Sequence, residues 1–457
     1  MNDRSSERPG RPGADEAGAG LEQRLRDRTA RVAVIGLGYV GLPLLRAVVG
    51  AGFDALGLDI DPAKVAALNA GRSYIRHLGD AAVGALVASG RFQASTDFDV
   101  LATADVVVVC VPTPLTRQRE PDLGFVVRTA EAIAQRLQPG QLVVLESTTY
   151  PGTTLEVLKP ILERSGLRVG SDVFLAYAPE REDPGNSDYA ASRIPKVVGG
   201  ADARATALAT AFYAPMVERV VPVSSAATAE AVKLTENVFR AVNIALVNEL
   251  KVIFEAMAID VWEVIDAAAT KPFGYMPFYP GPGLGGHCVP IDPFYLTWKA
   301  REFDIATRFI ELAGEINTEM PRHVVGRLAL ALDLRFGRGL SGARILVLGV
   351  AYKKNVDDMR ESPALRIIDL LEARRARVAY HDPHIPELPP SRHYPELAGR
   401  RSVALDAATL EAQDAVLIVT DHDGPDYAAV VASSRLVVDT RNATRDVRAY
   451  RERIVRA

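Results

Sequence analysis

The feature that most constrains the fold is a glycine-rich turn that directly follows a short apolar run. Residues 32–35 read Val-Ala-Val-Ile, which is typical of a buried parallel strand, and the pattern GLGYVG follows at once, with Gly36, Gly38 and Gly41 at the GxGxxG positions. The first glycine permits a tight turn, the second lets backbone approach a pyrophosphate, and the third lets helix and strand pack closely. A helix over 41–51 would present its free N–H groups to phosphate. The pattern predicts a Rossmann-type dinucleotide-binding domain.

An acidic residue supports this prediction. A second strand is expected at 55–58, and Asp59 ends it, where a carboxylate can accept hydrogen bonds from an adenosine ribose. Because no arginine for a 2′-phosphate lies beside it, NAD is favoured over NADP. Lys64 lies about one helical turn further on and either reaches the ribose region or is an ordinary surface lysine. The alternative is a glycine-rich turn with a structural role alone.

Composition limits the class of protein. A chain of 457 residues predicts about three domains, and 48% hydrophobic with 24% charged residues is ordinary globular composition. The net charge of −4 gives no basic face for a nucleic-acid partner. No apolar run approaches the roughly 18 residues of a membrane span. Only Cys110 and Cys288 occur, which excludes a disulfide scaffold and a cysteine-based metal site and predicts a reducing, cytoplasmic location.

Strand and helix patterns alternate through the first half of the chain. Further strands are expected at 106–111, 142–145, 173–176 and 220–223, so residues 30–225 are predicted to form an NAD-binding domain with a doubly wound parallel sheet. Residues 1–29 are polar and lack the apolar core of a secretory signal. They are expected to be a disordered tail, with at most a short helix over 21–28.

The second half begins with a change of pattern. Residues 226–257 lack glycine and proline and have apolar residues at three- and four-residue spacing, which predicts one helix of roughly 45 Å that could also be a dimer surface. A Gly/Pro/aromatic loop at 271–293 interrupts a central helical domain over 226–336. Strand-like runs then return at 345–349, 377–380, 416–419 and 436–438, which predicts a smaller Rossmann-like α/β domain over 337–457.

The loop at 281–292 is the strongest candidate for covalent chemistry. Four glycines within residues 281–286 leave room for a bulky ligand, and His287, Cys288 and Asp292 follow. Neighbouring cationic groups can depress a thiol pKa from about 8.5 and so supply a nucleophilic thiolate at Cys288. Cys110 ends a valine-rich strand instead, where a buried, inert thiol is expected.

Two further groups of residues are candidates for ligand contacts. Steps of four and three residues place Lys233, Asn237 and Arg240 on one helical face, either as a solvated stripe or to stabilise an oxyanion and orient a water. Tyr352 and Lys353 follow a strand that ends in one glycine, so the dinucleotide pattern is absent there. That strand end suits a nucleotide phosphate, and the alternative is a solvated charge run.

Together these segments resemble the UDP-glucose/GDP-mannose dehydrogenase family, from about residue 32 to residue 444. The motifs that carry the resemblance are GLGYVGLP at 36–43, VPTP at 111–114, ESTTYPGTT at 146–154, KLTENVFRAVNIALVNEL at 233–250, GPGLGGHCVPIDP at 281–293 and KKNVDDMRESPA at 353–364. The resemblance implies an enzyme that oxidises the C6 alcohol of a nucleotide sugar to a carboxylate with two NAD⁺ and a cysteine. It implies no metal.

The resemblance also assigns residues by position. The cofactor set that it implies is Gly36, Gly38, Tyr39, Val40, Gly41, Asp59 and Lys64, with Thr113 and Thr148 near the nicotinamide and Arg360 reaching from the last domain. The implied substrate contacts are Arg181, Glu182, Lys233, Asn237, Arg240, Gly283, Tyr352, Lys353 and Arg441, with Lys271 reaching the substrate of a neighbouring subunit. The implied catalytic set is Cys288, Lys233, Asn237 and Asp292, and the general base is either Lys233 or a water on Asp292.

One departure indicates the branch of the family. UDP-glucose members usually carry CxPKD, whereas this chain has Cys-Val-Pro-Ile-Asp with Ile291 in the lysine position. His287, Pro293 and the segment 179–185 are instead similar to the UDP-N-acetylhexosamine branch. Within it, segments 278–282 and 292–300 most resemble enzymes of UDP-N-acetylglucosamine, with UDP-N-acetylmannosamine or UDP-glucose as alternatives.

Two hypotheses compete with this one, a second kind of enzyme and a binding protein. A β-hydroxyacid dehydrogenase shares the Rossmann and long-helix plan, but it performs one oxidation and has no use for Cys288 or the third domain. A non-catalytic NAD-sensing protein would use the Gly/Cys loop structurally. The number of NADH formed per substrate distinguishes the three hypotheses as two, one or none.

Overall fold

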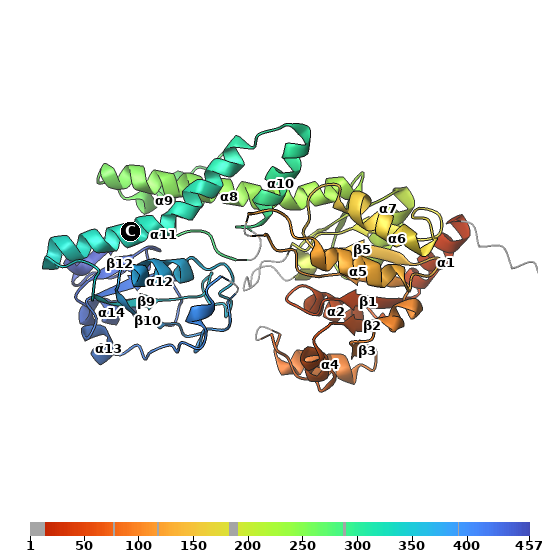
Figure 1. The fold of residues 1–457 in the computed structure, drawn as a ribbon, viewed down its shortest axis with the longest axis horizontal. Helices are drawn as coiled ribbons and strands as arrows, with labels where there is room; N and C mark the ends of the chain where they lie inside the picture. The colour runs from red at the N-terminus through yellow and green to blue at the C-terminus, as the bar shows by residue number, and fades with distance from the viewer. Residues whose placement is uncertain (1–13, 76–77, 117, 182–190, 287–288, 392) are drawn as a thin grey trace, which may run out of the picture. The chain divides into compact units, whose positions relative to one another are not determined.

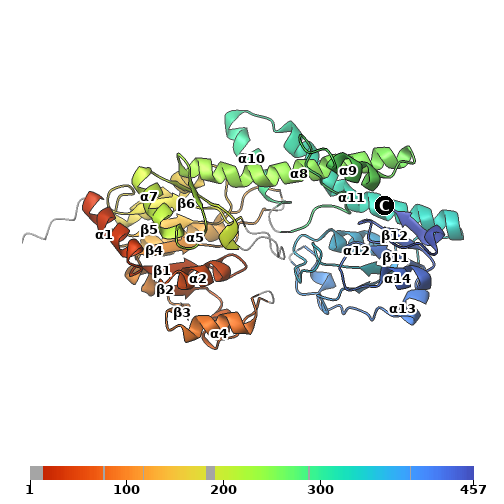
Figure 2. The ribbon, with the colours of Figure 1, turned by 180° about the vertical axis from the view of Figure 1, so that it is seen from behind.

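The computed structural model describes residues 14–75, 78–116, 118–181, 191–286, 289–391 and 393–457. The chain divides into two compact units, residues 1–235 and 236–457, and the boundary falls within the long helix α8 (Ala226–Ala256). Each unit contains its own sheet, and Figures 1 and 2 show both units from opposite sides.

The first unit is built on an eight-stranded sheet in the order β3-β2-β1-β4-β5-β6-β7-β8. Its strands are β1 (Arg31–Ile35), β2 (Asp54–Leu58), β3 (Phe92–Ser95), β4 (Val106–Val109), β5 (Leu142–Leu145), β6 (Phe174–Tyr177), β7 (Lys196–Gly200) and β8 (Val220–Pro222). All neighbours pair in parallel except β6 and β7. The order 3-2-1-4-5-6 is that of a doubly wound Rossmann sheet, whose ligand site lies where the order reverses, between β1 and β4.

Helices cover both faces of this sheet. They are α1 (Ala14–Arg26), α2 (Gly41–Gly50), α3 (Pro62–Asn69), α4 (Asp80–Ala88), α5 (Gly124–Ala134), α6 (Lys159–Leu162) and α7 (Ala203–Tyr213). Alternate residues of the strands point to opposite faces. Val32 and Val34 of β1 pack with α2 and α7, whereas Ala33 and Ile35 pack with α5 and α6. Both faces are therefore buried, which explains the continuous apolar runs in the sequence.

The prediction of a disordered tail is wrong for residues 14–20, and the short helix expected within 21–28 is the second half of a longer helix. Residues 14–26 form helix α1, and Leu21 and Leu25 are fully buried in the core beside α7. These two leucines are four residues apart and share one helical face. Arg24 and Arg31 both contact Asp105, Arg24 through its side chain and Arg31 through its backbone N–H. The composition of the segment concealed a short amphipathic helix that only tertiary packing stabilises.

The second unit begins with helices. Besides the rest of α8 it contains α9 (Val261–Ala269), α10 (Asp292–Ala300) and α11 (Arg308–Phe336). Asn248 of α8 and Asn317 of α11 are buried and bonded to each other, Nδ2 to Oδ1, at 2.9 Å. Asn317 also donates to the Ala241 carbonyl, so two amides join α8 and α11. No helix among the described residues is long and apolar enough to cross a bilayer.

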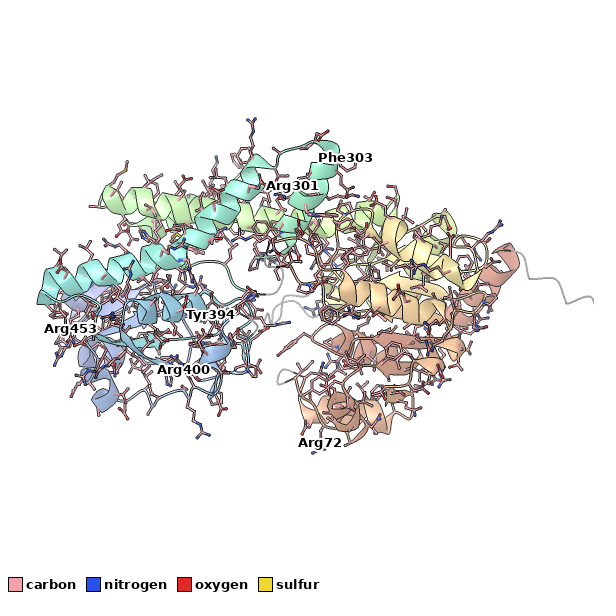
Figure 3. All side chains as sticks on the ribbon, in the orientation of Figure 1. Arg72, Arg301, Phe303, Tyr394, Arg400 and Arg453 are labelled. Atoms are coloured by element: carbon pink, nitrogen blue, oxygen red, sulfur yellow. The ribbon has the colours of Figure 1, made fainter. Side chains whose placement is uncertain are left out.

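A five-stranded parallel sheet completes the second unit, in the order β10-β9-β11-β12-β13. Its strands and helices are β9 (Arg344–Leu348), α12 (Pro363–Ala373), β10 (Arg377–His381), α13 (Ala407–Glu411), β11 (Ala415–Ile418), α14 (Tyr427–Ser433), β12 (Val437–Asp439) and β13 (Ile454–Arg456). Arg400, labelled in Figure 3, donates to both carboxylate oxygens of Glu372 at the end of α12. The order 2-1-3-4-5 places the ligand end of this sheet between β9 and β11.

The predicted fold class is confirmed: an N-terminal Rossmann-type domain, a long-helix region and a smaller Rossmann-like α/β domain. The sequence analysis missed β3, β7 and β13. β7 contains Gly199 and Gly200 and begins with Lys196, so its pattern did not indicate a strand. The Lys196 side chain is buried against Glu146 and Glu180, and β7 pairs with β6 in antiparallel order.

Candidate active site

The glycine turn after β1 has the geometry that a bound dinucleotide requires. Gly36 has φ +91°, and a Cβ there would lie 2.3 Å from the Cys110 carbonyl oxygen. A Cβ at Gly41 would lie 1.9 Å from the Gly36 carbonyl oxygen, whereas one at Gly38 would meet nothing within 4 Å. Backbone is thus tightly packed below the turn and open at Gly38. Tyr39 and Val40 lie between, half-buried, and α2 begins directly after them.

Asp59 lies beside this turn, as predicted. It is buried, its Oδ2 accepts the Leu37 N–H at 3.0 Å and its Oδ1 accepts the Asp61 N–H at 3.0 Å. The Lys64 Nζ lies 3.5 Å from Oδ2. A carboxylate offers about four acceptor positions, so both oxygens retain capacity for ribose hydroxyls. Tyr74, which the sequence analysis missed, donates its hydroxyl to the Leu37 carbonyl.

The loops after β4 and β5 carry the two predicted nicotinamide residues. Thr113 is buried and Thr148 is half-buried, and both follow strands at the carboxyl edge of the sheet. Ser147 joins the loops, because its Oγ accepts the Val111 N–H at 2.9 Å and donates to the Val111 carbonyl at 2.8 Å. A serine within an apolar strand-loop pattern gave the sequence analysis no signal for this role.

Lys233 lies on α8 and is buried within the first unit. Its Nζ donates to the backbone carbonyl of Glu180, in the loop after β6. Arg181 follows, and its Nη1 donates to the Pro195 carbonyl at 2.6 Å. Glu182, a predicted substrate contact, lies outside the described residues. The Lys233 Nζ is thus held by a backbone carbonyl, which carries no formal charge.

Glu230 lies one turn before Lys233 and anchors α8. Its carboxylate accepts the N–H groups of Gly152 and Thr154 and the Thr154 hydroxyl, at 2.6–2.9 Å. Burial raises the pKa of Glu230 to about 7, against the lowering effect of these hydrogen bonds. This contact joins α8 to the segment that follows Thr148. Sequence analysis missed it, since glutamate on a helix ordinarily indicates a solvated face.

A buried ion pair lies at the same sheet. Lys196 of β7 is 3.0 Å from a Glu146 carboxylate oxygen, which also accepts the Tyr213 hydroxyl. Lys196 Nζ is also 3.4 Å from Glu180 Oε2. Burial raises the pKa of the Cys110 thiol well above its usual value. Cys110 therefore stays protonated at neutral pH and is a poor nucleophile.

In the second unit, Asn237 and Asp292 form a buried pair. The Asn237 Nδ2 donates to the Asp292 Oδ2 at 2.6 Å, with 4% and 3% of the two residues exposed. Asp292 is the first residue of α10, where a carboxylate interacts favourably with the helix dipole. Arg240 and Lys271 are exposed, and Lys271 lies over the Phe273 ring. His287 and Cys288 lie outside the described residues.

The glycine loop before Cys288 packs on the last domain. A Cβ at Gly285 would lie 2.8 Å from the Tyr352 Cβ, and one at Gly281 would lie 2.6 Å from the Arg441 guanidinium. Gly283 has φ +136°, a backbone conformation suited to glycine. The structure therefore brings Gly283, Tyr352 and Arg441, all predicted substrate contacts, to one region. Burial lowers the pKa of Arg441.

Two predicted residues of the last domain lie at its surface. Arg360 is exposed and its guanidinium pairs with Asp358 at 2.6 Å within the same domain. Lys353 is half-buried beside Tyr352.

The described His, Cys, Asp and Glu side chains form no group of three or more that could hold a metal ion.

Comparisons with known proteins cover most of the chain. Three models of the UDP-glucose/GDP-mannose dehydrogenase family match it: the NAD binding domain at residues 30–217, the central domain at 227–319 and the UDP binding domain at 346–446. A UDP-N-acetyl-D-glucosamine 6-dehydrogenase of Pseudomonas aeruginosa is 37% identical over 357 residues, 78% of this chain and 83% of the relative. An NDP-N-acetyl-D-galactosaminuronic acid dehydrogenase of Ralstonia nicotianae is 34% identical over 421 residues, which are 90% of this chain and 95% of the relative.

A solved structure agrees with these relatives. The UDP-D-ManNAc dehydrogenase of Pyrococcus horikoshii superimposes with a TM-score of 0.82 at 33% identity, over 90% of this chain and 96% of that one. The NAD binding domain match coincides with the glycine turn and Asp59, and the UDP binding domain match includes Tyr352 and Arg441. The chain therefore belongs to the UDP-glucose/GDP-mannose dehydrogenase family and is an NAD-dependent oxidoreductase of nucleotide sugars.

Proposed function

We propose that this enzyme oxidises the C6 alcohol of a UDP-N-acetylhexosamine, with UDP-N-acetylglucosamine preferred, to the uronate. The observation that carries the proposal is the buried Asn237–Asp292 pair. The hydrogen bond joins Asn237 of the long helix to Asp292, which lies four residues after Cys288 in the chain. The pair therefore supplies polar groups that can hold water or an oxyanion close in sequence to the cysteine. A single oxidation of a β-hydroxyacid needs no such arrangement.

The chain's residues divide the reaction into steps. Lys233, or a water on Asp292, takes the proton of the C6 hydroxyl as the alcohol is oxidised to an aldehyde. The Cys288 thiolate adds to the aldehyde and forms a thiohemiacetal, whose oxidation leaves a thioester. Water then hydrolyses the thioester to the carboxylate and frees the thiol. Covalent capture replaces one difficult oxidation by easier steps, and Lys233 and Asn237 stabilise the oxyanions.

Gly36, Gly38, Asp59 and Lys64 would hold NAD⁺, which would supply the oxidising chemistry as the hydride acceptor of each oxidation. Overall, one alcohol, two NAD⁺ and one water give one carboxylate, two NADH and three protons. We therefore expect two NADH per sugar nucleotide consumed. A ratio of one would favour the β-hydroxyacid dehydrogenase alternative, and no NADH would favour a binding protein.

The preferred sugar rests on the loop chemistry and on the relatives. Ile291 replaces the lysine that UDP-glucose members carry, and the relatives above are named for N-acetylated sugars. The extra methyl of an N-acetyl group is worth about 1–3 kcal/mol, roughly 10- to 200-fold in kcat/KM, when a pocket fits it. Measuring kcat/KM for UDP-N-acetylglucosamine, its manno and galacto epimers and UDP-glucose tests this. A preference for UDP-glucose would refute the proposal.

We further propose that the enzyme acts as a homodimer in the cytoplasm. On α8, Phe239, Leu246 and Ile253 recur every seven residues and are 42–50% exposed. A seven-residue apolar stripe is suited to pair with its own copy about a two-fold axis. Sedimentation should give a dimer for the wild type and a monomer for Leu246→Glu. A wild-type monomer at micromolar concentration would contradict this.

A further inference from the structure

A buried aspartate–histidine pair in the last domain has no part in the chemistry above. Asp382 follows β10 and His422 follows β11, and they are 2% and 1% exposed. The His422 Nε2 lies 3.1 Å from the Asp382 Oδ2. Both residues lie at the carboxyl edge of the sheet where its strand order reverses, which is the ligand-binding edge of such sheets.

Hydrogen bonds indicate the tautomer of His422. Its Nδ1 accepts the backbone N–H of Asn355 at 3.0 Å, so Nδ1 carries no hydrogen. Its Nε2 therefore carries the hydrogen and donates it to Asp382. The ring thus joins the Asp382 carboxylate to the backbone amide of Asn355.

Asp382 differs from its counterpart in the NAD-binding domain. Its Oδ2 accepts the N–H groups of Val350 and Ala351 at 2.7 and 3.0 Å besides His422, and its Oδ1 accepts two further backbone N–H groups. Asp59 also follows the second strand of its sheet, yet each of its oxygens accepts only one backbone N–H. Five donors leave Asp382 no capacity for a ribose. The aspartate after the second strand is thus the proposed ribose contact in the first domain, Asp59, whereas in the last domain its counterpart Asp382 holds a backbone loop.

That loop is Val350 to Asn355, and it is held at both ends. Val350 and Ala351 bond to Asp382, and Asn355 bonds to His422. The Thr420 hydroxyl donates to the Ala351 carbonyl at 2.6 Å. Asn355 has φ +59°, a conformation that such contacts must stabilise.

We propose that His422 and Asp382 are positioning residues for substrate binding: they hold the Val350–Asn355 loop so that Tyr352 and Lys353 meet the UDP part of the sugar nucleotide. The inference rests on the proposed function and on the substrate contacts that the family resemblance implies for Tyr352 and Lys353. His422 itself does not touch the substrate. Its loss therefore weakens UDP binding and leaves the NAD⁺ site and the reacting centre unchanged.

The test uses the full-length enzyme and UDP as the probe. His422→Leu removes both ring hydrogen bonds, and we expect it to raise the Kd for UDP and the KM for the sugar nucleotide about tenfold. The kcat and the KM for NAD⁺ should stay within about twofold. His422→Asn places an amide oxygen where Nδ1 lies and should recover most of the UDP affinity. His393→Leu, at an exposed histidine of the same domain, is the control.

The outcomes separate the inference from the proposed function. If the wild type fails to bind UDP in calorimetry, the proposed function is wrong. Suppose instead that the wild type binds UDP and that folded His422→Leu has a Kd for UDP within twofold of the wild-type value: the positioning role is then wrong. It is also wrong if kcat and NAD⁺ affinity fall in this variant as much as UDP affinity does. Should His422→Leu not fold, Thr420→Val removes one loop anchor and is expected to raise the Kd for UDP about threefold. Unchanged affinity in Thr420→Val would then overturn the inference.

Discussion

At the scale of single residues, Asp59 is the proposed NAD contact of the first domain. It is buried beside the glycine turn and keeps acceptor capacity on both oxygens. Replacing it by alanine removes charge-assisted bonds worth about 1.5–3 kcal/mol each. We expect Asp59→Ala to raise the KM for NAD⁺ at least tenfold and to leave the KM for the sugar nucleotide nearly unchanged. The matched control is Asp61→Ala, which removes only the N-cap of α3. Equal NAD⁺ KM values in the two variants would contradict the assignment.

The two cysteines offer an internal comparison. Cys288 is the proposed nucleophile, whereas burial raises the pKa of Cys110 and keeps its thiol protonated. Cys288→Ser should bind NAD⁺ and sugar nucleotide but lose at least a thousandfold in kcat, because a hydroxyl is a far weaker nucleophile than a thiolate. Cys110→Ser should retain most of its kcat. Initial-rate assays check both, and near wild-type turnover in Cys288→Ser would exclude covalent capture by this residue.

Lys251 on α8 is expected to lower the free energy of unfolding at neutral pH. Its Nζ is buried and has no hydrogen-bond partner among the described residues. Burial lowers its pKa to about 8. The unfolded chain then binds more protons between about pH 8 and 10.5, so this residue makes stability rise with pH across that range. Lys251→Met should stabilise the enzyme at pH 7 by up to about 3 kcal/mol.

Denaturant unfolding at pH 7 and pH 10 measures the Lys251 effect. The gain should shrink at pH 10, where the wild-type amine is largely neutral. Lys271→Met, at an exposed lysine, should change stability by less than about 0.5 kcal/mol at either pH. A Lys251→Met variant less stable than the wild type at pH 7 would show that the ammonium has a stabilising partner.

At the scale of elements, Glu230 joins α8 to the segment after β5. Its pKa of about 7 exceeds that of an unfolded glutamate, so the folded state favours the protonated form. Stability from this group is full below about pH 4.5 and is lost as pH rises to 7. Between pH 5 and 8 the wild type should therefore lose up to about 3 kcal/mol relative to Glu230→Gln, which does not titrate. Urea unfolding at both pH values checks this, and a stability difference independent of pH would refute the assignment.

Glu230 also lies close in sequence to Lys233, a proposed catalytic residue on the same helix. Glu230 and Lys233 are three residues apart on α8 and bind to different loops, the 152–154 segment and Glu180. The register of α8 is thus fixed by a carboxylate and an ammonium on one face.

At the scale of the whole molecule, the two α/β domains divide the ligands. The NAD binding domain match ends at residue 217 and the UDP binding domain match begins at residue 346. Lys353→Ala should raise the KM for the sugar nucleotide about tenfold and leave that for NAD⁺ unchanged, because it removes one phosphate contact. Lys354→Ala is the neighbouring control, since Lys354 pairs with Asp423. A change in NAD⁺ KM alone would reverse the assignment of the domains.

Local patterns in the sequence determined much of this molecule. The glycine turn, Asp59 and the valine-rich strands specify a Rossmann sheet because backbone conformation and burial on both faces each demand particular residues. The long helix was predicted at 226–257 and spans Ala226–Ala256. The loop motif around Gly283 identified a region that the structure brings against Tyr352 and Arg441.

Only the tertiary structure decided which polar residues are partners. Charged residues are ordinarily found at the surface, yet Glu230, Glu146 and Lys196 are buried, and strands and loops remote in the chain supply their polar partners. Helix α1 packs Leu21 and Leu25 against α7, and this tertiary contact stabilises a helix that would be marginal on its own. Likewise, His422 and Asp382 are 40 residues apart in sequence and meet only because β10 and β11 flank β9. Sequence determines local conformation, whereas pairing between distant residues depends on how the sheets and helices pack.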